Sequence, residues 1–341
     1  MKTRMLVLTT VLGLLVSSLA FAESMASQYK PNLQRSFCEA TEKAADFLVM
    51  SQMPLRSGKV GWSWVLGDGS HPDNIAGLAA LGLLDAYAAT GKDKYLAAAR
   101  RYADGLVDGR SRYSAKNLPY KADIELLARL GGMPQGDTYQ QAAKDLQGLI
   151  QARSPEAAKE IDRIAAGRSA EPALLGFDAA LAVRAATAAG ERSYAYALAD
   201  AVLGRLSTWY QPVKDPRYSL VSAASLVVAL ERLDAGRYRA TVDRLREDLR
   251  AAQNQNGSWI ENETQPSAYA AQGLWGSPAG ADQEGALRAL AWIKTTMLRS
   301  GGFAHYNDGM PEPFVGQMIS EVNAEALSAL AGACRGGLDG K

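Results

Sequence analysis

The stretch from residue 220 to residue 259 reads LVSAASLVVALERLDAGRYRATVDRLREDLRAAQNQNGSW. Its first part, residues 220–230, is apolar nearly all round, which is typical of a helix buried on every side. Its second part, residues 237–252, has apolar residues at helical spacing with charges between them. The stretch therefore predicts a buried inner helix followed by an amphipathic outer helix.

This alternation extends along most of the chain. Inner helices are expected to start near Asn74, Lys121, Pro172, Ser219, Pro266 and Glu321, about 50 residues apart, a period typical of repeat architectures. Outer helices are expected at residues 34–51, 93–107, 136–166, 191–206, 237–252 and 283–297. Ser154-Pro155 should break the third outer segment into two helices, because serine can cap a helix and proline can open one.

The first and last helices indicate that the six helix pairs close into a ring. An open solenoid needs polar capping repeats, but the first and last helices here are as apolar as the others. We therefore predict an all-α fold, an (α/α)6 toroid or six-hairpin barrel. Gly91, Gly190 and Gly236 follow inner helices, where a left-handed residue commonly ends a helix.

The N-terminus predicts export. Lys2 and Arg4 precede an apolar run, and Ala20-Phe21-Ala22 fits the small-x-small rule for signal cleavage. A membrane anchor is the alternative, but the run is shorter than the ~20 residues that span a bilayer. We expect a signal peptide at residues 1–22, one toroid domain at residues 23–341, and a periplasmic or secreted, monomeric protein.

Charge and cysteine content narrow the partners. Without Lys2 and Arg4 the chain has 35 basic and 36 acidic residues and no long run of like charge, so neither nucleic acid nor a membrane surface is expected as a partner. Cys38 and Cys334 lie near the two ends of the mature chain, and in an oxidising compartment we expect a disulfide that latches the ring. Two separate buried thiols are the alternative. No metal or other cofactor is expected.

Three junctions from an outer to an inner helix share glycine followed by an aromatic residue. They are Ser57-Gly58-Lys59-Val60-Gly61-Trp62, Asn256-Gly257-Ser258-Trp259 and Ser300-Gly301-Gly302-Phe303. With Gln253 and Gln255 before it, the second resembles the glutamine-tryptophan repeat of the α/α-toroid superfamily, which includes squalene cyclases, protein prenyltransferases and polysaccharide lyases. Packing between repeats is the expected role of Trp259 and Phe303. The resemblance implies the toroid fold more than any activity.

The known activities of the superfamily fit this sequence unequally. A terpene-protonating cyclase is expected to have Asp-x-Asp-Asp, and this chain has no such string. A zinc prenyltransferase needs an Asp, Cys and His set in the ring, and the two cysteines lie at the chain ends. Both activities are disfavoured.

Chemistry is expected at the mouth where the loops enter the inner helices. The segment Asp68-Gly69-Ser70-His71-Pro72-Asp73-Asn74 is the richest junction, with His71 as base and Asp73 as orienting group or acid. Capping of the next helix by Asp73 or Asn74 is the alternative. His305 and Tyr306 form a second possible acid and base pair, and Glu321 is a further catalytic candidate.

Other mouth positions are candidates for ligand binding. They are Trp64, Asn74, Tyr120, Asp123, Asp178, Tyr218, Glu263, Tyr269 and Asn323. Helix capping is the alternative role for most of the acidic residues. Asp178 and Arg184 are charged residues inside an apolar helix, so each should find a partner on another helix, as a structural ion pair or beside the central pocket.

These observations predict an exported carbohydrate-active enzyme, a polysaccharide lyase or glycoside hydrolase, that binds a polysaccharide or another small or extended ligand in the central cleft. Paired carboxylates suit hydrolysis, and a histidine and tyrosine pair suits elimination. The alternative is a non-catalytic envelope module that binds a glycan or apolar ligand. A lipid-modifying protein related to terpenoid cyclases is the third reading.

Overall fold

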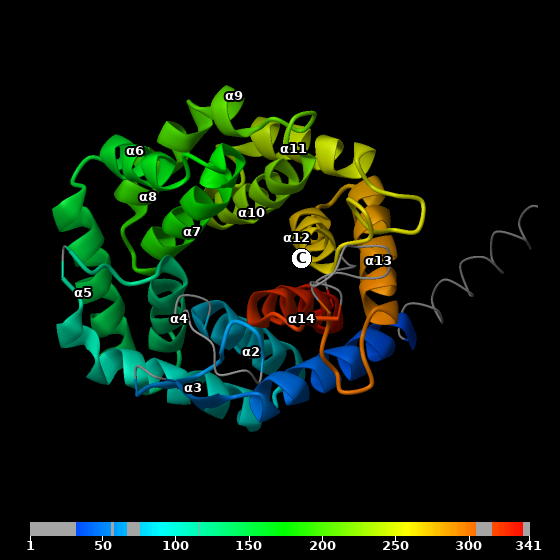
Figure 1. The fold of residues 1–341 in the computed structure, drawn as a ribbon, viewed down its shortest axis with the longest axis horizontal. Helices are drawn as coiled ribbons and strands as arrows, with labels where there is room; N and C mark the ends of the chain where they lie inside the picture. Colours follow the sequence, from blue (N-terminus) through cyan, green and yellow to red (C-terminus); the bar gives the residue numbers. More distant parts are fainter. Residues whose placement is uncertain (1–31, 56–57, 67–75, 115, 305–315, 337–341) are drawn as a thin grey trace, which may run out of the picture.

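The computed structural model describes residues 32–55, 58–66, 76–114, 116–304 and 316–336. The expected signal peptide lies outside these residues. Helices dominate the described chain and form a ring around a central axis, as Figure 1 shows.

Six helices form the inner wall of the ring. They are α2 (Ala76–Thr90), α4 (Lys121–Gly131), α7 (Leu175–Ala188), α10 (Pro216–Asp234), α12 (Thr264–Leu274) and α14 (Ser320–Arg335). Each packs against the next in this order, and α14 packs against α2. This last contact closes the ring, so the prediction of an α/α toroid is confirmed.

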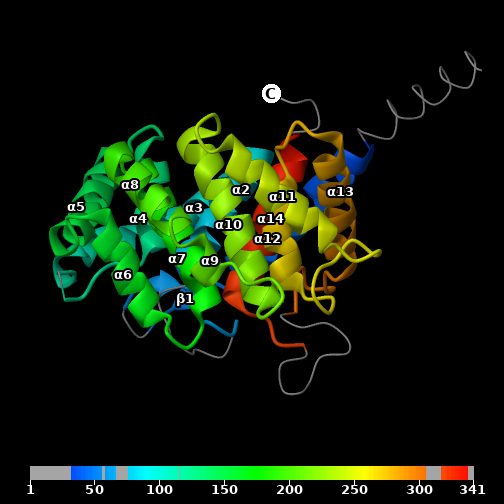
Figure 2. The same ribbon diagram turned by 90° about the horizontal axis from the view of Figure 1, so that it is seen from above.

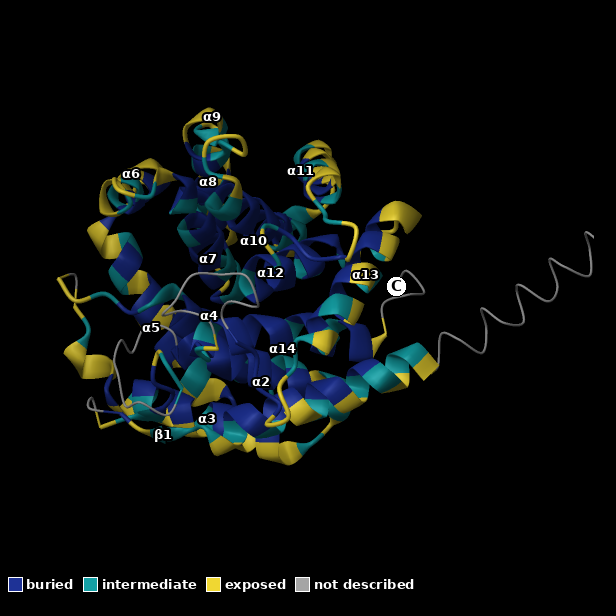
Figure 3. Cartoon of the chain, turned by 45° about the vertical axis from the view of Figure 1, so that its right-hand side comes forward, coloured by how far each residue is buried: buried dark blue, intermediate teal, exposed yellow. Residues whose placement is uncertain are grey.

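The outer wall is made of the amphipathic helices. They are the first helix at residues 32–50, α3 (Asp93–Asp108), α5 (Asp137–Arg153), α6 (Ala157–Gly167), α8 (Arg192–Leu203), α11 (Arg239–Ala251) and α13 (Gly280–Thr295). The break between α5 and α6 falls at Ser154-Pro155, as predicted. Figure 3 shows the inner helices mostly buried and the outer helices exposed along one side, which matches the two hydrophobic patterns.

Short elements fill the junctions. Strands β1 (Met53–Pro54) and β2 (Val60–Gly61) pair antiparallel, with Met53 opposite Gly61. The 3-10 helices η1 (Arg110–Arg112) and η2 (Pro172–Leu174) precede α4 and α7, and α9 (Leu206–Trp209) precedes α10. Seen edge-on in Figure 2, β1 and α9 lie toward the same face of the ring.

Junction aromatics seal the gaps between helix pairs. Trp62 and Trp259 are fully buried, and their indole Nε1 groups donate to the carbonyls of Leu48 (2.7 Å) and Leu249 (2.8 Å) near the ends of outer helices. The sequence analysis missed a third tryptophan of this kind, Trp209, because it lacks the preceding glycine. Its indole Nε1 donates to the carbonyl of Val202 of α8 across 3.1 Å. These tryptophans satisfy helix-end carbonyls that would otherwise lack a partner.

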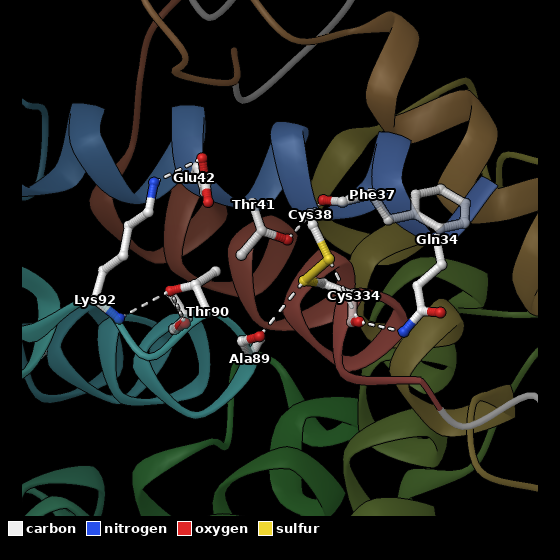
Figure 4. Close-up of a disulfide and its surroundings, with 10 residues drawn as sticks. Gln34, Phe37, Cys38, Thr41, Glu42, Ala89, Thr90, Lys92 and Cys334 are labelled. Carbon is white, nitrogen blue, oxygen red and sulfur yellow. Dashed lines mark hydrogen bonds and ion pairs between the residues drawn. A yellow bond between two sulfur atoms is a disulfide. The ribbon is translucent and has the colours of Figure 1, made fainter. Parts of the chain in front are cut away.

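The disulfide between Cys38 and Cys334 joins the first helix to α14, as predicted (Figure 4). Beside it, the amide of Gln34 donates to the Cys334 carbonyl across 2.9 Å. The ring is thus closed by a covalent bond as well as by packing. In the described part of the chain no helix has the length and hydropathy needed to cross a membrane.

The expectation for the helix-ending glycines is confirmed at two positions and wrong at one. Gly91 and Gly190 have φ of 69° and 92°, whereas Gly236 has no such left-handed conformation. The carboxylate of Asp234 instead accepts the backbone N–H of Arg237 across 2.9 Å. Helix α10 therefore ends without a left-handed residue, and this bond stabilises the turn that leads to α11.

Candidate active site

Glu321 lies in the first turn of α14, at the mouth where the inner helices begin. The phenol of Tyr269, on α12, donates a hydrogen bond to its Oε1 across 3.2 Å. Burial, and then the nearby Glu325 and Asp178, raise the pKa of Glu321 to about 7, although Tyr269 and Arg168 act in the opposite direction. This carboxyl group is therefore protonated in a large fraction of molecules near neutral pH.

Glu325 follows one turn later on the same face of α14, so the two carboxyl groups repel each other when both are charged. It is 5% exposed, and the side-chain amide of Gln272 donates to its Oε2 across 2.8 Å. Burial raises the pKa of Glu325, and the guanidinium of Arg184 opposes the shift. The half-buried Glu321 and the buried Glu325 thus form a carboxyl pair in which a proton is readily held.

Asp178 brings a third carboxyl group from the first turn of α7. Arg168, which follows the last turn of α6, donates to it from Nε across 2.5 Å and from Nη2 across 3.3 Å. A bidentate pair of this kind fixes the orientation of the carboxylate. Asp178 accordingly has a partner on another element, as the sequence predicted, and it lies close enough to Glu321 to influence its pKa.

Aromatic side chains surround these carboxyl groups. The rings of Phe177 and Tyr269 meet edge to face with centroids 5.6 Å apart. Burial, and secondarily nearby carboxylates, raise the pKa values of Tyr120 and Tyr269 well above the ordinary value, so both phenols remain protonated. They can donate hydrogen bonds at neutral pH but are poor bases.

The segment that leads toward His71 runs beside the start of α14. The Trp64 carbonyl accepts the backbone N–H of Ser320 across 2.9 Å, and Val65 bridges Ile319. The Trp64 side chain is 43% exposed, which leaves its ring accessible. Trp64 is therefore placed near Glu321, in keeping with a ligand-binding role. His71, Asp73, Asn74, His305 and Tyr306, which were sequence candidates, lie outside the described residues.

Other sequence candidates have structural partners. Asp123 is buried and accepts from the phenol of Tyr102 across 2.9 Å, while Glu263 is ion-paired with Arg217 at 2.7 Å. Burial raises the pKa of Glu263 despite this arginine. The ring of Tyr218 lies under the Arg217 guanidinium, 5.3 Å from it.

Asn323 has a clear structural function. Its Oδ1 accepts the Phe303 N–H across 2.7 Å, and its Nδ2 donates to the carbonyls of Phe303 and Ile319, each across 2.9 Å. Ser267 of α12 accepts the Trp259 N–H in the same way across 3.0 Å. Both side chains fasten a junction aromatic to the following inner helix, which explains the burial of Asn323 without a ligand.

A charged network lies deeper in the ring, and in it Arg184 has the partner on another helix that the sequence predicted, although the other members were missed. Glu125 of α4 is 2% exposed and pairs with Arg184 of α7 and Arg232 of α10, each at 2.8 Å. Asp85 of α2 pairs with Arg129 of α4 at 2.6 Å. The arginines lower the pKa values of Glu125 and Asp85 against the effect of burial. These ion pairs cross the interior of the ring and join α2, α4, α7 and α10.

A sequence signal for this network existed. Lys121, Glu125 and Arg129 repeat every four residues on α4, so they share one face of an inner helix. Charges on a helix that is buried all round need partners, and the ring axis is the place where inner helices can supply them. Among the described residues, no group of three or more His, Cys, Asp or Glu side chains is arranged to hold a metal ion.

Comparison with known proteins identifies the class of fold. No protein-family model matches the sequence, and no curated protein does. Among solved structures, a glycosyl hydrolase family 88 protein from Bacteroides vulgatus is 14% identical with a TM-score of 0.61, and the match covers 89% of this chain and 99% of that chain. The chain has the fold of the α/α-toroid superfamily, as the junction motifs suggested.

Two further structures show how broad this class is. A polysaccharide lyase is 15% identical with a TM-score of 0.59, covering 89% of this chain and 97% of that chain. A type II terpene cyclase from Scytonema is 12% identical with a TM-score of 0.57, covering 88% and 98%. Because carbohydrate-active enzymes and a terpene cyclase share the fold, the choice between functions depends on the site.

Proposed function

We propose that this protein is an exported carbohydrate-active enzyme that hydrolyses a glycosidic bond at the mouth of the ring. The observation that carries the proposal is Glu321, a half-buried carboxyl group with a pKa of about 7 beside the arginine-paired Asp178. Glycoside hydrolysis uses a protonated carboxyl group and an ionised one, and different environments separate the two forms. The likeness to solved polysaccharide lyase and glycosyl hydrolase structures supports the assignment.

Each group has a role in this reaction. Glu321 donates its proton to the glycosidic oxygen while the bond from that oxygen to the anomeric carbon breaks. Asp178 accepts a proton from the water that attacks the anomeric carbon, and Arg168 holds the Asp178 carboxylate in position through two hydrogen bonds. Tyr269 holds the Glu321 carboxyl group in position. The products are two sugars, and the proton held by Asp178 returns to Glu321 through solvent.

Two comparisons favour hydrolysis over the alternatives. A lyase that used Tyr120 or Tyr269 as its base would need a phenol that ionises easily, and the pKa values of these two residues are raised instead. A terpene cyclase must protonate an alkene, which needs a strong acid, and a carboxyl group with a pKa of about 7 is a weak one. A glycosidic oxygen is far easier to protonate than an alkene, because proton transfer accompanies the breaking of its bond to the anomeric carbon.

The test is a screen of the purified protein against neutral and acidic polysaccharides, following reducing ends and ultraviolet absorbance together. New reducing ends without absorbance, lost in Glu321→Gln but kept in Glu284→Gln, would support the proposal. Glu284 is an exposed carboxylate on α13 and serves as the matched control. Ultraviolet absorbance from an unsaturated sugar would show that the reaction is an elimination and not a hydrolysis. No product on any polymer would favour the non-catalytic binding module.

Export and assembly are tested separately. We propose that the mature protein starts at Glu23, forms one toroid domain and is a monomer in the periplasm or outside the cell. Mass spectrometry of protein recovered from the envelope or medium would give the first residue. Size-exclusion chromatography with light scattering would give the mass.

A further inference from the structure

A pocket lies toward the end of the ring opposite Glu321. It has a volume of about 190 Å³. The later turns of α2, α10, α12 and α14 line it, chiefly through Asp85, Val228, Arg232, Gln272, Trp275 and Arg335. The pocket adjoins the network around Glu125, because Arg232 both lines the pocket and pairs with Glu125. Neither Glu321 nor Asp178 lines the pocket, so it is distinct from the proposed active site.

Two arginines and two carboxylates line this pocket, and further arginines lie behind the lining as ion-pair partners. Of the acidic residues that line it, Asp85 pairs with Arg129 at 2.6 Å and Glu231 pairs with Arg246 at 2.7 Å. Glu125 is shared by Arg184 and Arg232. Together with Arg335, the described lining residues and their ion-pair partners comprise five guanidinium groups and three carboxylates. Even when Glu325 is ionised, one positive charge remains in excess.

The excess positive charge acts on Arg232. Desolvation and the nearby Arg184 guanidinium lower its pKa, and Glu125 only partly offsets them. Its side chain is nevertheless 45% exposed, so a ligand in the pocket can reach it. An anion placed here would relieve repulsion between Arg232 and Arg184, and would be held by charge-assisted hydrogen bonds.

The remaining lining limits the size and shape of the ligand. The volume is below the ~300 Å³ at which pockets for drug-sized molecules begin, so the space suits a molecule of about monosaccharide size. Trp275 lines one side, and its ring is fixed against Gly332, where an added Cβ would lie 3.3 Å from the indole Cδ1. The immobilised indole offers a flat apolar surface.

We propose that this pocket is a second ligand site, which binds a small carboxylate of monosaccharide size. Arg232 and Arg335 hold the carboxylate, and the body of the ligand packs against Trp275. Gln272 and Ser328 are polar groups of the lining that can bond its hydroxyl groups. The lining is linked to the group around Glu321 only through Gln272, which also donates to Glu325, whereas Arg232, Arg335 and Trp275 have no role in the proposed hydrolysis.

Calorimetric titration with glucuronate, and with glucose as the neutral probe of similar size, tests the proposal. We expect glucuronate to bind and glucose to bind at least about tenfold more weakly, because charge-assisted hydrogen bonds are worth more than neutral ones. Equal affinity for both sugars would overturn the assignment of an anion site.

Variants then locate the site. Arg335→Gln removes an exposed cation and Val228→Phe fills the pocket, and each should weaken glucuronate binding roughly tenfold. Arg153→Gln, an exposed arginine at the end of α5, is the matched control and should bind as the wild type does. Glu321→Gln should also bind normally. Binding that survives both Arg335→Gln and Val228→Phe, or that is lost in Glu321→Gln, would place the ligand elsewhere and refute the proposal.

Discussion

Tyr269 donates a hydrogen bond to Glu321 across 3.2 Å and so joins α12 to α14 at the mouth of the ring. This bond opposes the raised pKa of Glu321, because a donor stabilises the charged carboxylate. The two residues lie 52 positions apart, and only closure of the ring brings them together. The first prediction concerns this pair.

Tyr269→Phe should shift the pH dependence of activity to higher pH. Loss of the phenol raises the pKa of Glu321 further, so the protonated acid persists to higher pH and the alkaline limb of kcat/KM moves upward. The free energy of unfolding should fall by about 1 kcal/mol, which is typical of one lost hydrogen bond. Tyr139→Phe removes a similar tyrosine–carboxylate bond, to Asp104, at the surface and should leave the profile unchanged. An unchanged profile in Tyr269→Phe would disconnect Tyr269 from the acid.

Glu321→Gln should lower activity by about 100-fold or more, since general acid catalysis contributes about that factor. In the wild-type protein, kcat/KM should fall as the pH rises through about 7, the pKa of Glu321, because the acid form is lost. A rate governed by a base at this position would instead rise with pH. A fully active Glu321→Gln would remove this residue from the mechanism.

The stability of Glu321→Gln should also depend less on pH. The pKa of Glu321 is raised from 4.5 to about 7 on folding, so the folded state binds more protons between these values. The wild type is then stabilised at low pH and loses this stabilisation as pH rises through about 7, by at most about 3 kcal/mol. Thermal unfolding of both proteins from pH 4.5 to 8 measures the difference. Parallel curves for the two proteins would show that Glu321 titrates normally.

The helix pairs could be read from the sequence because each inner or outer helix has a hydrophobic pattern of its own. The partners of the buried charges could not be read from the sequence. Arg184 and Glu125 are 59 residues apart, and nothing local in either helix indicates which of the neighbouring inner helices supplies the opposite charge. Asn323 was expected to bind a ligand, but its amide holds the Phe303 loop. A polar residue at the start of an inner helix can therefore hold a junction loop in place instead of binding a ligand or taking part in catalysis.

The latch between Cys38 and Cys334 should contribute strongly to stability. It closes a loop with a sequence separation of 296 residues, and restriction of the unfolded chain favours the folded state by up to about 5 kcal/mol. We expect the double variant Cys38→Ser/Cys334→Ser to unfold at a lower denaturant concentration, measured by circular dichroism. Addition of a reductant should destabilise the wild type but not this variant. Equal midpoints for wild type and variant would show that packing of α14 on α2 closes the ring without help.

Trp259→Phe should destabilise the protein through one unpaired carbonyl. Phenylalanine keeps most of the apolar surface of this fully buried side chain but cannot donate to Leu249, so the cost should be about 1–3 kcal/mol. Trp64→Phe is the control, because Trp64 is 43% exposed and should cost little. The same loss in both variants would mean that ring size, and not the indole N–H, matters. A greater loss in Trp259→Phe alone would establish that the junction tryptophans act as caps for the outer helices as well as fillers between them.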